Sequence, residues 1–462
     1  MARRRIVGGL RRHAARAALA IAVAAAPVAA GAQTLTDALI SAYETSGLLE
    51  QNRALLRAAD EDVAGAVAAL RPVLNYIAQA NWTDPVLPGE DNTSGSLALS
   101  AEMLLWDFGR SRLAVEAAKE TVLATRAGLI DVEQSVLLRA VAAYMDVRRQ
   151  VALINLRQNN VQLIQEQLRA AQDRFDVGEV TRTDVSIAEA RLAAARSGLV
   201  AAQGALAQAR QEYIVAIGEE AGALAVPPPL PDTASSLDAA TAIALQRQPA
   251  ILRAQHEVAS ADILVSIAEA GRLPRLTGSA QISVDDDGDD RQSLGLSLRG
   301  PIYQGGAISS DLRQARARRD ASRAVLLITS ENVVQNVANS WADLSVANAV
   351  LTATDEQVRA ARLALRGAQE ELEVGARTTL DVLDLEQDLL QAETDRIDAQ
   401  INRYVATYQL LSQMGLLSVE HLGLGIPTYD PAAYYNAVRN APLGNVSPQG
   451  ERLDRLLEAI GR

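Results

Sequence analysis

The chain of 462 residues carries 44 basic and 56 acidic residues, two phenylalanines and no cysteine. Its net charge of −12 does not suit nucleic acid, whose phosphates it would repel, and the lack of cysteine excludes disulfides, thiolate metal sites and a cysteine nucleophile. Aromatic side chains bury the most area per residue, so their scarcity favours long packed helices over a large enzyme core.

The first 32 residues have the pattern of a secretion signal. Six arginines between Arg3 and Arg16 precede an apolar run at 17–26, and small residues follow up to Ala32. We therefore expect residues 1–32 to be a signal peptide that is removed before Gln33. Beyond it, no stretch of about 20 residues is free of charge, so a membrane crossing would have to use strands.

The rest of the chain repeats itself at an offset of 197 residues. The segment VGEVTRTDV, which begins at Val177, corresponds to VGARTTLDV, which begins at Val374. An ungapped correspondence over such a distance indicates an internal duplication. We expect a first repeat at 33–235, a second at 236–418 and a C-terminal tail at 419–462.

Each repeat has the same predicted order of elements: a helical segment, two strands, a very long helix, a tip turn and a last helix. The helical segments are expected at 36–70 and 236–272, the strands near 72–83, 94–106, 274–284 and 292–302, the long helices at 110–176 and 307–373, and the tip turns at 176–184 and 373–381.

The long helices lack proline and carry apolar residues at coiled-coil spacing. At 1.5 Å per residue each would be a rod of about 100 Å, which two shorter helices laid end to end would match. This favours a tall helical barrel, although an antiparallel coiled coil in a soluble scaffold would show the same spacing.

The strands alternate apolar and polar residues over about 10 positions, as in a transmembrane barrel. In the second repeat, Leu276, Ala280 and Ile282 alternate with polar residues. Polar loops at 84–92 and 285–290 join the strands, and the second lacks the spacing of a calcium loop. Four strands alone would leave unpaired edges in lipid, so several chains must share a barrel. Three chains would supply twelve strands and an aqueous lumen.

The twin VGxxTxxDV turns, with WDFG at 106–109 and IYQGG at 302–306, resemble those of the TolC family of outer-membrane factors. The resemblance spans residues 35–417. It implies a homotrimer that joins a twelve-stranded barrel in outer-membrane lipid to a long α-helical barrel in the periplasm. It also implies a passive exit duct for an efflux pump or type I secretion system, served by a periplasmic adaptor and an inner-membrane transporter of RND, ABC or MFS type. A soluble periplasmic coiled-coil scaffold or adaptor is the alternative.

The resemblance also implies roles for residues at the tip turns. Asp381 and Asp384, spaced i, i+3 on one helix face, would form two carboxylate rings at the constriction of a trimer. Asp381 is also at capping-box spacing from Thr378, which would make it a helix start instead. The ring is the interpretation we favour.

Arg377 resembles the gate arginine of the family, with Thr183 and Asp184 as its partners in the first repeat. For Asp184 by itself, capping of its own helix is at least as strong an interpretation. Leu372 departs from the pattern, since well-known members carry a gate tyrosine there. The turns themselves are expected to dock the adaptor, through Val177, Gly178, Thr181, Val374, Gly375 and Thr378.

No pattern indicates an enzyme, a metal or a cofactor. His256 and His421, the histidines beyond the signal, lie in no nucleophile or metal-ligand pattern. The glycine pair Gly305-Gly306 lacks the lysine of a phosphate-binding loop. In the tail at 419–462, which the resemblance places in the periplasm, prolines predict irregular structure, followed by a short amphipathic helix at 453–460.

Overall fold

The computed structural model describes residues 32–85 and 92–441. The predicted signal peptide, the centre of the first strand loop and the predicted tail helix lie outside these residues. Among the described helices, none combines the length and apolarity that a membrane span requires.

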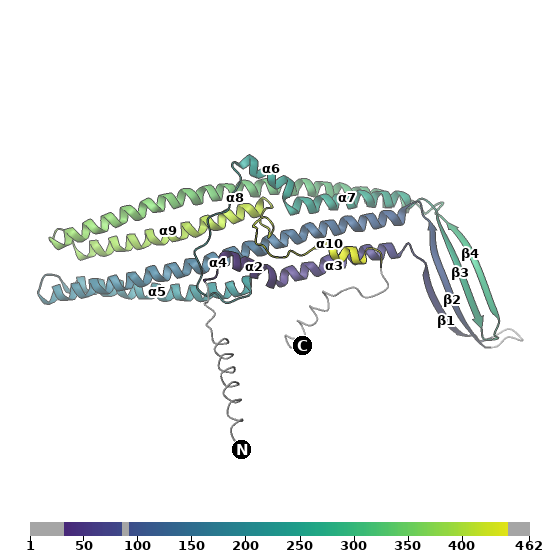
Figure 1. Ribbon diagram of the computed structural model, residues 1–462, viewed down its shortest axis with the longest axis horizontal. Helices are drawn as coiled ribbons and strands as arrows, with labels where there is room; N and C mark the ends of the chain where they lie inside the picture. Colours follow the sequence, from purple (N-terminus) through teal and green to yellow (C-terminus); the bar gives the residue numbers. More distant parts are fainter. Residues whose placement is uncertain (1–31, 86–91, 442–462) are drawn as a thin grey trace, which may run out of the picture.

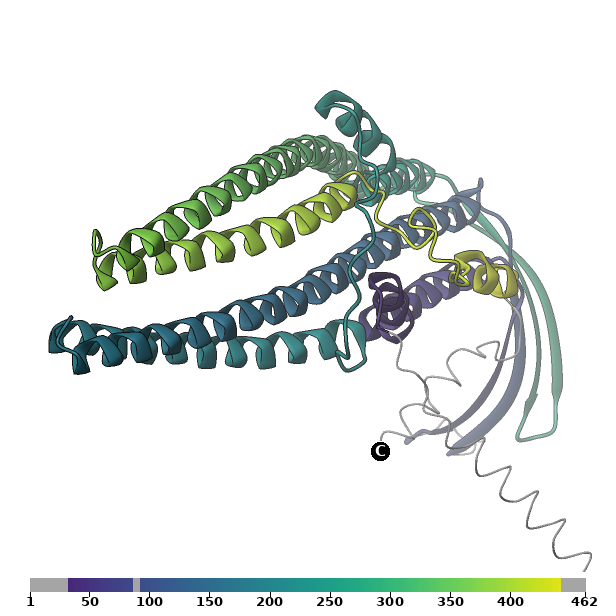
Figure 2. The ribbon, with the colours of Figure 1, turned by 60° about the vertical axis from the view of Figure 1, so that its left-hand side comes forward.

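The molecule is elongated, with its long helices parallel to its length and a sheet at one end (Figure 1). α4 (Arg110–Asp176) and α8 (Ala307–Glu373) are 67 residues each, as the sequence predicts. α5 (Arg182–Ile217) and α9 (Thr379–Gln413) pair with the halves of α4 and α8 that are far from the sheet, forming two hairpins whose tips lie at the same end (Figures 1 and 2). α3 (Gly47–Ala68) and α7 (Pro249–Ala270) run beside the halves near the sheet.

The helical segment that opens each repeat is broken in two, which corrects the prediction of continuous helices at 36–70 and 236–272. α2 (Leu35–Thr45) ends before Ser46, whose backbone is extended and whose side-chain hydroxyl caps α3 by accepting a hydrogen bond from the Leu49 amide at 3.3 Å. α6 (Leu237–Arg247) ends before Gln248, which is extended because the ring of Pro249 disfavours helical geometry in the preceding residue.

Four antiparallel strands form one sheet in chain order: β1 (Val73–Trp82), β2 (Thr93–Trp106), β3 (Arg275–Asp285) and β4 (Asp290–Arg299). β2 of the first repeat pairs with β3 of the second, so the two repeats are joined within one sheet. β4 ends at Arg299, short of the predicted 302, because Pro301 has no amide to donate. β1 and β4 are open edges in a single chain.

The main core lies at mid-length, where α2, α4, α5, α9 and the segment after α9 meet. Tyr144 and Leu137 of α4 pack there with Tyr213 of α5 and Leu411 of α9. The hydroxyl of Tyr144 lies 2.8 Å from the Ala225 carbonyl oxygen, which ties the link between the repeats to α4. α10 (Pro431–Val438) packs beside α3, where the Tyr434 hydroxyl donates to Glu61 at 2.7 Å. The core therefore holds the hairpins at mid-length and leaves their tips projecting.

Candidate constriction at the hairpin tips

Both hairpins turn through a glycine in the left-handed region. Gly178 has a φ of 84° and Gly375 a φ of 74°. This conformation ends a helix at little cost only when the residue lacks a Cβ. Val177 and Val374, just before the glycines, are exposed at the tips. The expected docking residues thus form two matching turns at one end of the molecule (Figure 2).

A capping box follows each turn. At the start of α9, the Asp381 carboxylate accepts hydrogen bonds from the Thr378 amide at 3.0 Å and its hydroxyl at 2.8 Å. These bonds lower the pKa of Asp381, so the group is held charged. Thr181 and Asp184 make the same pair of bonds at the start of α5. The capping interpretation of Asp381 and Asp184 is therefore correct for the single chain, and the carboxylate ring stays a prediction.

The second carboxylate of the predicted constriction has a different partner. Asp384 Oδ1 lies 2.5 Å from Arg191 Nη2 of α5. The sequence places Asp381 and Asp384 on one helix face, yet only Asp381 bonds within its own helix. Asp384 instead joins the second hairpin to the first. Asp381 thus stabilises the start of α9, whereas Asp384 stabilises the contact between the two hairpins.

The predicted gate arginine contacts its own hairpin. Arg377 Nε donates to Glu371 Oε2 at 2.7 Å across the tip turn, and this bond raises the pKa of the guanidinium. Among the described residues of one chain, Arg377 has this acidic partner rather than Asp184. The gate bond from Arg377 to Thr183 and Asp184 stays a prediction.

The contact between the hairpins also contains a group that sequence reasoning missed. Glu386 is 3% exposed, and its Oε1 accepts a hydrogen bond from Gln167 of α4 at 3.3 Å. Its other oxygen has no hydrogen-bond partner among the described residues. Burial raises the pKa of Glu386 to about 7. The sequence does contain a signal for the burial of Glu386. The residue lies four positions after the buried Val382 and three after the buried Leu383, so it shares their helix face.

Leu383 supplies the apolar part of the same contact. It is buried against Ile164 of α4 and against Ala188 and Leu192 of α5. The contacts by which the hairpins meet near their tips thus include one buried leucine, one ion pair and one buried carboxyl. We call Leu383, Asp384 and Glu386 with their partners Arg191 and Gln167 the hairpin latch.

Long projecting hairpins attached to a small sheet with open edges are the arrangement expected of a channel-forming outer-membrane protein. The family model described as "Outer membrane efflux protein" matches residues 38–219 and 241–416, and the chain belongs to that family. The predicted outer-membrane efflux channel, its TolC-like fold and its location are thereby confirmed, and the soluble scaffold is not supported.

Individual relatives agree. The chain is 36% identical to Outer membrane efflux protein BepC of Brucella suis over 430 residues, covering 91% of this chain and 94% of that protein. It is 25% identical to Outer membrane protein TolC of Escherichia coli over 83% of each chain. Among solved structures, VceC of Vibrio cholerae matches with a TM-score of 0.71 and 23% identity, covering 82% of this chain and 96% of that one; this likeness concerns the fold.

Proposed function

We propose that three copies of this chain form a passive exit duct whose periplasmic end is closed by the hairpin tips. The open edges of β1 and β4 support this, because strands in lipid must pair along both edges. Three chains supply twelve strands, enough for a water-filled lumen. The long helices continue the duct through the periplasm.

The duct works with two partners. A periplasmic adaptor docks on the two tip turns around Gly178 and Gly375, and an inner-membrane transporter supplies the energy. The matching geometry of the turns supports a partner that engages both repeats alike. A passive duct needs no catalytic group, so we propose that the chain has no enzyme activity.

The hairpin latch is the observation that carries the gating proposal. It is the contact that joins the second hairpin to the first beside the predicted constriction. When the latch opens, Asp384 leaves Arg191 and its carboxylate becomes free to face the lumen. In a trimer, Asp381 and Asp384 then form two rings of negative charge that attract cations.

Single-channel conductance in a planar lipid bilayer tests this function. We expect small, cation-selective openings for the wild type and larger ones for Arg377→Ala, which loosens the tip turn. The double variant Asp381→Ala/Asp384→Ala should lose block by multivalent cations. Arg359→Ala is the matched control, because among the described residues the ion-pair partner of that exposed arginine is Glu356 in its own helix.

Each of these measurements tests a different part of the proposal. Absence of conductance from inserted protein would contradict the duct. Unchanged block in the double variant would remove the two aspartates from the constriction while leaving the duct in place. Equal conductance in Arg377→Ala and Arg359→Ala would remove Arg377 from the gate.

A further inference from the structure

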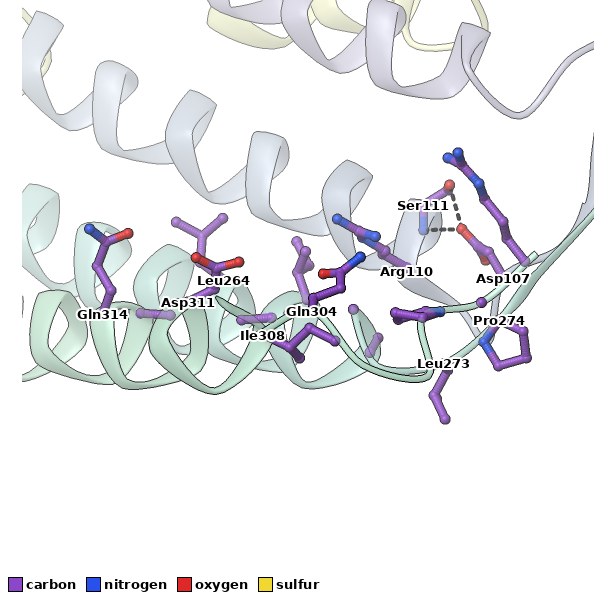
Figure 3. Close-up of a pocket in the computed structure, with 18 of the residues that line it drawn as sticks. Asp107, Arg110, Ser111, Leu264, Leu273, Pro274, Gln304, Ile308, Asp311 and Gln314 are labelled. Carbon is purple, nitrogen blue, oxygen red and sulfur yellow. Dashed lines mark hydrogen bonds between the residues drawn. The ribbon is translucent and has the colours of Figure 1, made fainter. Parts of the chain in front are cut away.

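A cavity of about 780 Å³ lies where the sheet meets the helices, far from the hairpin tips. It is lined by the start of α4, the end of α7, the start of α8 and the adjoining ends of β3 and β4. Figure 3 shows Arg110, Gln304 and Asp311 among its polar side chains and Leu264 and Ile308 among its apolar ones. Its wall is therefore amphipathic.

Four arginines line this cavity: Arg110, Arg275, Arg299 and Arg318. Arg275 and Arg299 are direct cross-strand partners at the ends of β3 and β4. Directly opposed residues share a face of the sheet, and like charges in that arrangement destabilise it. The pair therefore costs free energy in the empty cavity.

Acidic side chains offset these charges only in part. Among the described residues, none of the four guanidinium groups has a carboxylate within ion-pair distance, whereas nearby Arg316 pairs with Glu269 at 2.9 Å. Asp107 and Asp311 line the cavity as well. The Asp107 carboxylate caps the start of α4, because its Oδ2 accepts hydrogen bonds from the Ser111 amide at 2.7 Å and from the Ser111 hydroxyl at 2.5 Å. The cavity keeps an excess of positive charge.

The cavity also lies at a defined depth relative to the membrane. Trp106 ends β2, pairs with Leu276 next to Arg275, and is 60% exposed. Tyr303, in the link from β4 to α8, is 85% exposed. Tryptophan and tyrosine mark the level of lipid headgroups, so for a chain of this outer-membrane family the cavity stands at the periplasmic headgroup level.

We propose that this cavity binds the phosphate group of an anionic phospholipid. Arginine forks bind phosphate oxygens through paired charge-assisted hydrogen bonds, and basic pockets at the membrane surface hold anionic headgroups. A bound phosphate offsets the opposed charges of Arg275 and Arg299 at the end of the cavity next to the strands. The first repeat lacks this arginine pair in the described strands, because Val73 at the start of β1 pairs with the acidic Glu102.

Isothermal titration calorimetry on the purified full-length trimer in neutral detergent tests the proposal. The probes are dihexanoyl phosphatidylglycerol, dihexanoyl phosphatidylcholine and inorganic phosphate. The variant is Arg275→Gln/Arg299→Gln, and the matched control is Arg291→Gln, which removes an arginine at the opposite end of β4. Size-exclusion elution and the unliganded Tm establish that each variant folds and assembles.

We expect phosphatidylglycerol to bind the wild type and Arg291→Gln alike, and the double variant at least about tenfold more weakly, because each lost charge-assisted bond costs roughly 1.5 kcal/mol or more. Phosphatidylcholine, which has no net charge, should bind more weakly than phosphatidylglycerol. Inorganic phosphate that binds as tightly as phosphatidylglycerol, and loses affinity in the double variant, would support the phosphate site but identify free phosphate as its ligand. Absence of binding by both anions, or equal affinity in the double variant and the wild type, would overturn the proposal.

Discussion

Arg191 of α5 and Asp384 of α9 form an ion pair, with Nη2 and Oδ1 2.5 Å apart, that joins two helical hairpins from different repeats. Two residues further along α9, the buried carboxyl of Glu386 meets Gln167 of α4. These two contacts and the packing of Leu383 make up the hairpin latch. The strength of the latch therefore depends on one exposed charge pair and one titratable buried group.

Replacing Arg191 by alanine should increase channel opening modestly. The ion pair is partly exposed, and such pairs contribute about 0 to 1 kcal/mol, so we expect up to about a fivefold rise in open probability in a planar bilayer. The exchange variant Arg191→Asp/Asp384→Arg should restore the wild-type value. An open probability that is unchanged in Arg191→Ala would show that the pair does not hold the tips.

The latch should weaken as the pH rises. Burial raises the pKa of Glu386 from its usual 4.5 to about 7, so the packed hairpins bind this proton more tightly than separated ones. The resulting stability is fully present below about pH 4.5 and is lost as the pH rises through about 7, by on the order of 1 to 3 kcal/mol. Hydrogen exchange of backbone amides at 382–390, corrected for intrinsic rates, should show greater protection at pH 5 than at pH 8.

Glu386→Gln provides the matched variant for that measurement. It keeps the shape of the side chain and removes its titration, so protection at 382–390 should no longer depend on pH. Glu373→Gln, in an exposed position at the end of α8, should retain the wild-type dependence. The same pH dependence in Glu386→Gln as in the wild type would assign it to another group.

Thr378→Ala should fray the first turn of α9. The substitution removes the hydroxyl that the Asp381 amide donates to at 3.2 Å, and loss of such a cap costs about 1 kcal/mol. Exchange of the amides at 379–382 should accelerate roughly fivefold, while Thr378→Ser keeps the hydroxyl and should be nearly neutral. Equal rates in Thr378→Ala and the wild type would show that the capping box adds little at this tip.

Two glycines with the same backbone conformation should differ in their tolerance of alanine. Gly375 has a φ of 74° and open space around its Cα, so Gly375→Ala should cost only about 1 to 2 kcal/mol. Gly415 has a φ of 73°, but an added Cβ would lie 2.6 Å from the Arg247 carbonyl oxygen. Gly415→Ala should therefore cost several kcal/mol, about 1 to 3 more than Gly375→Ala, and lower the Tm of the trimer further. Equal Tm values would mean that α6 shifts to admit the methyl group.

Local sequence patterns predicted much of the fold. The proline-free spacing of apolar residues in 110–176 and 307–373 and the alternation in the strands depend on neighbours within a few residues, so they are readable without the structure. The breaks at Ser46 and Gln248 were missed because apolar spacing continues through them. The Gln248-Pro249 pair was nevertheless a local signal of a break.

The residue pairs of the latch could not be predicted in the same way. Thr378 and Asp381 lie three positions apart in one chain segment. The sequence alone therefore predicted their capping box, as the alternative to the carboxylate ring. Asp384 and Glu386 meet Arg191 and Gln167 from another hairpin. Spacing along one helix shows which side chains share a face, but not what that face will touch. Only the tertiary structure decided these partners, because the packing of distant helices sets which charges are paired and which are buried.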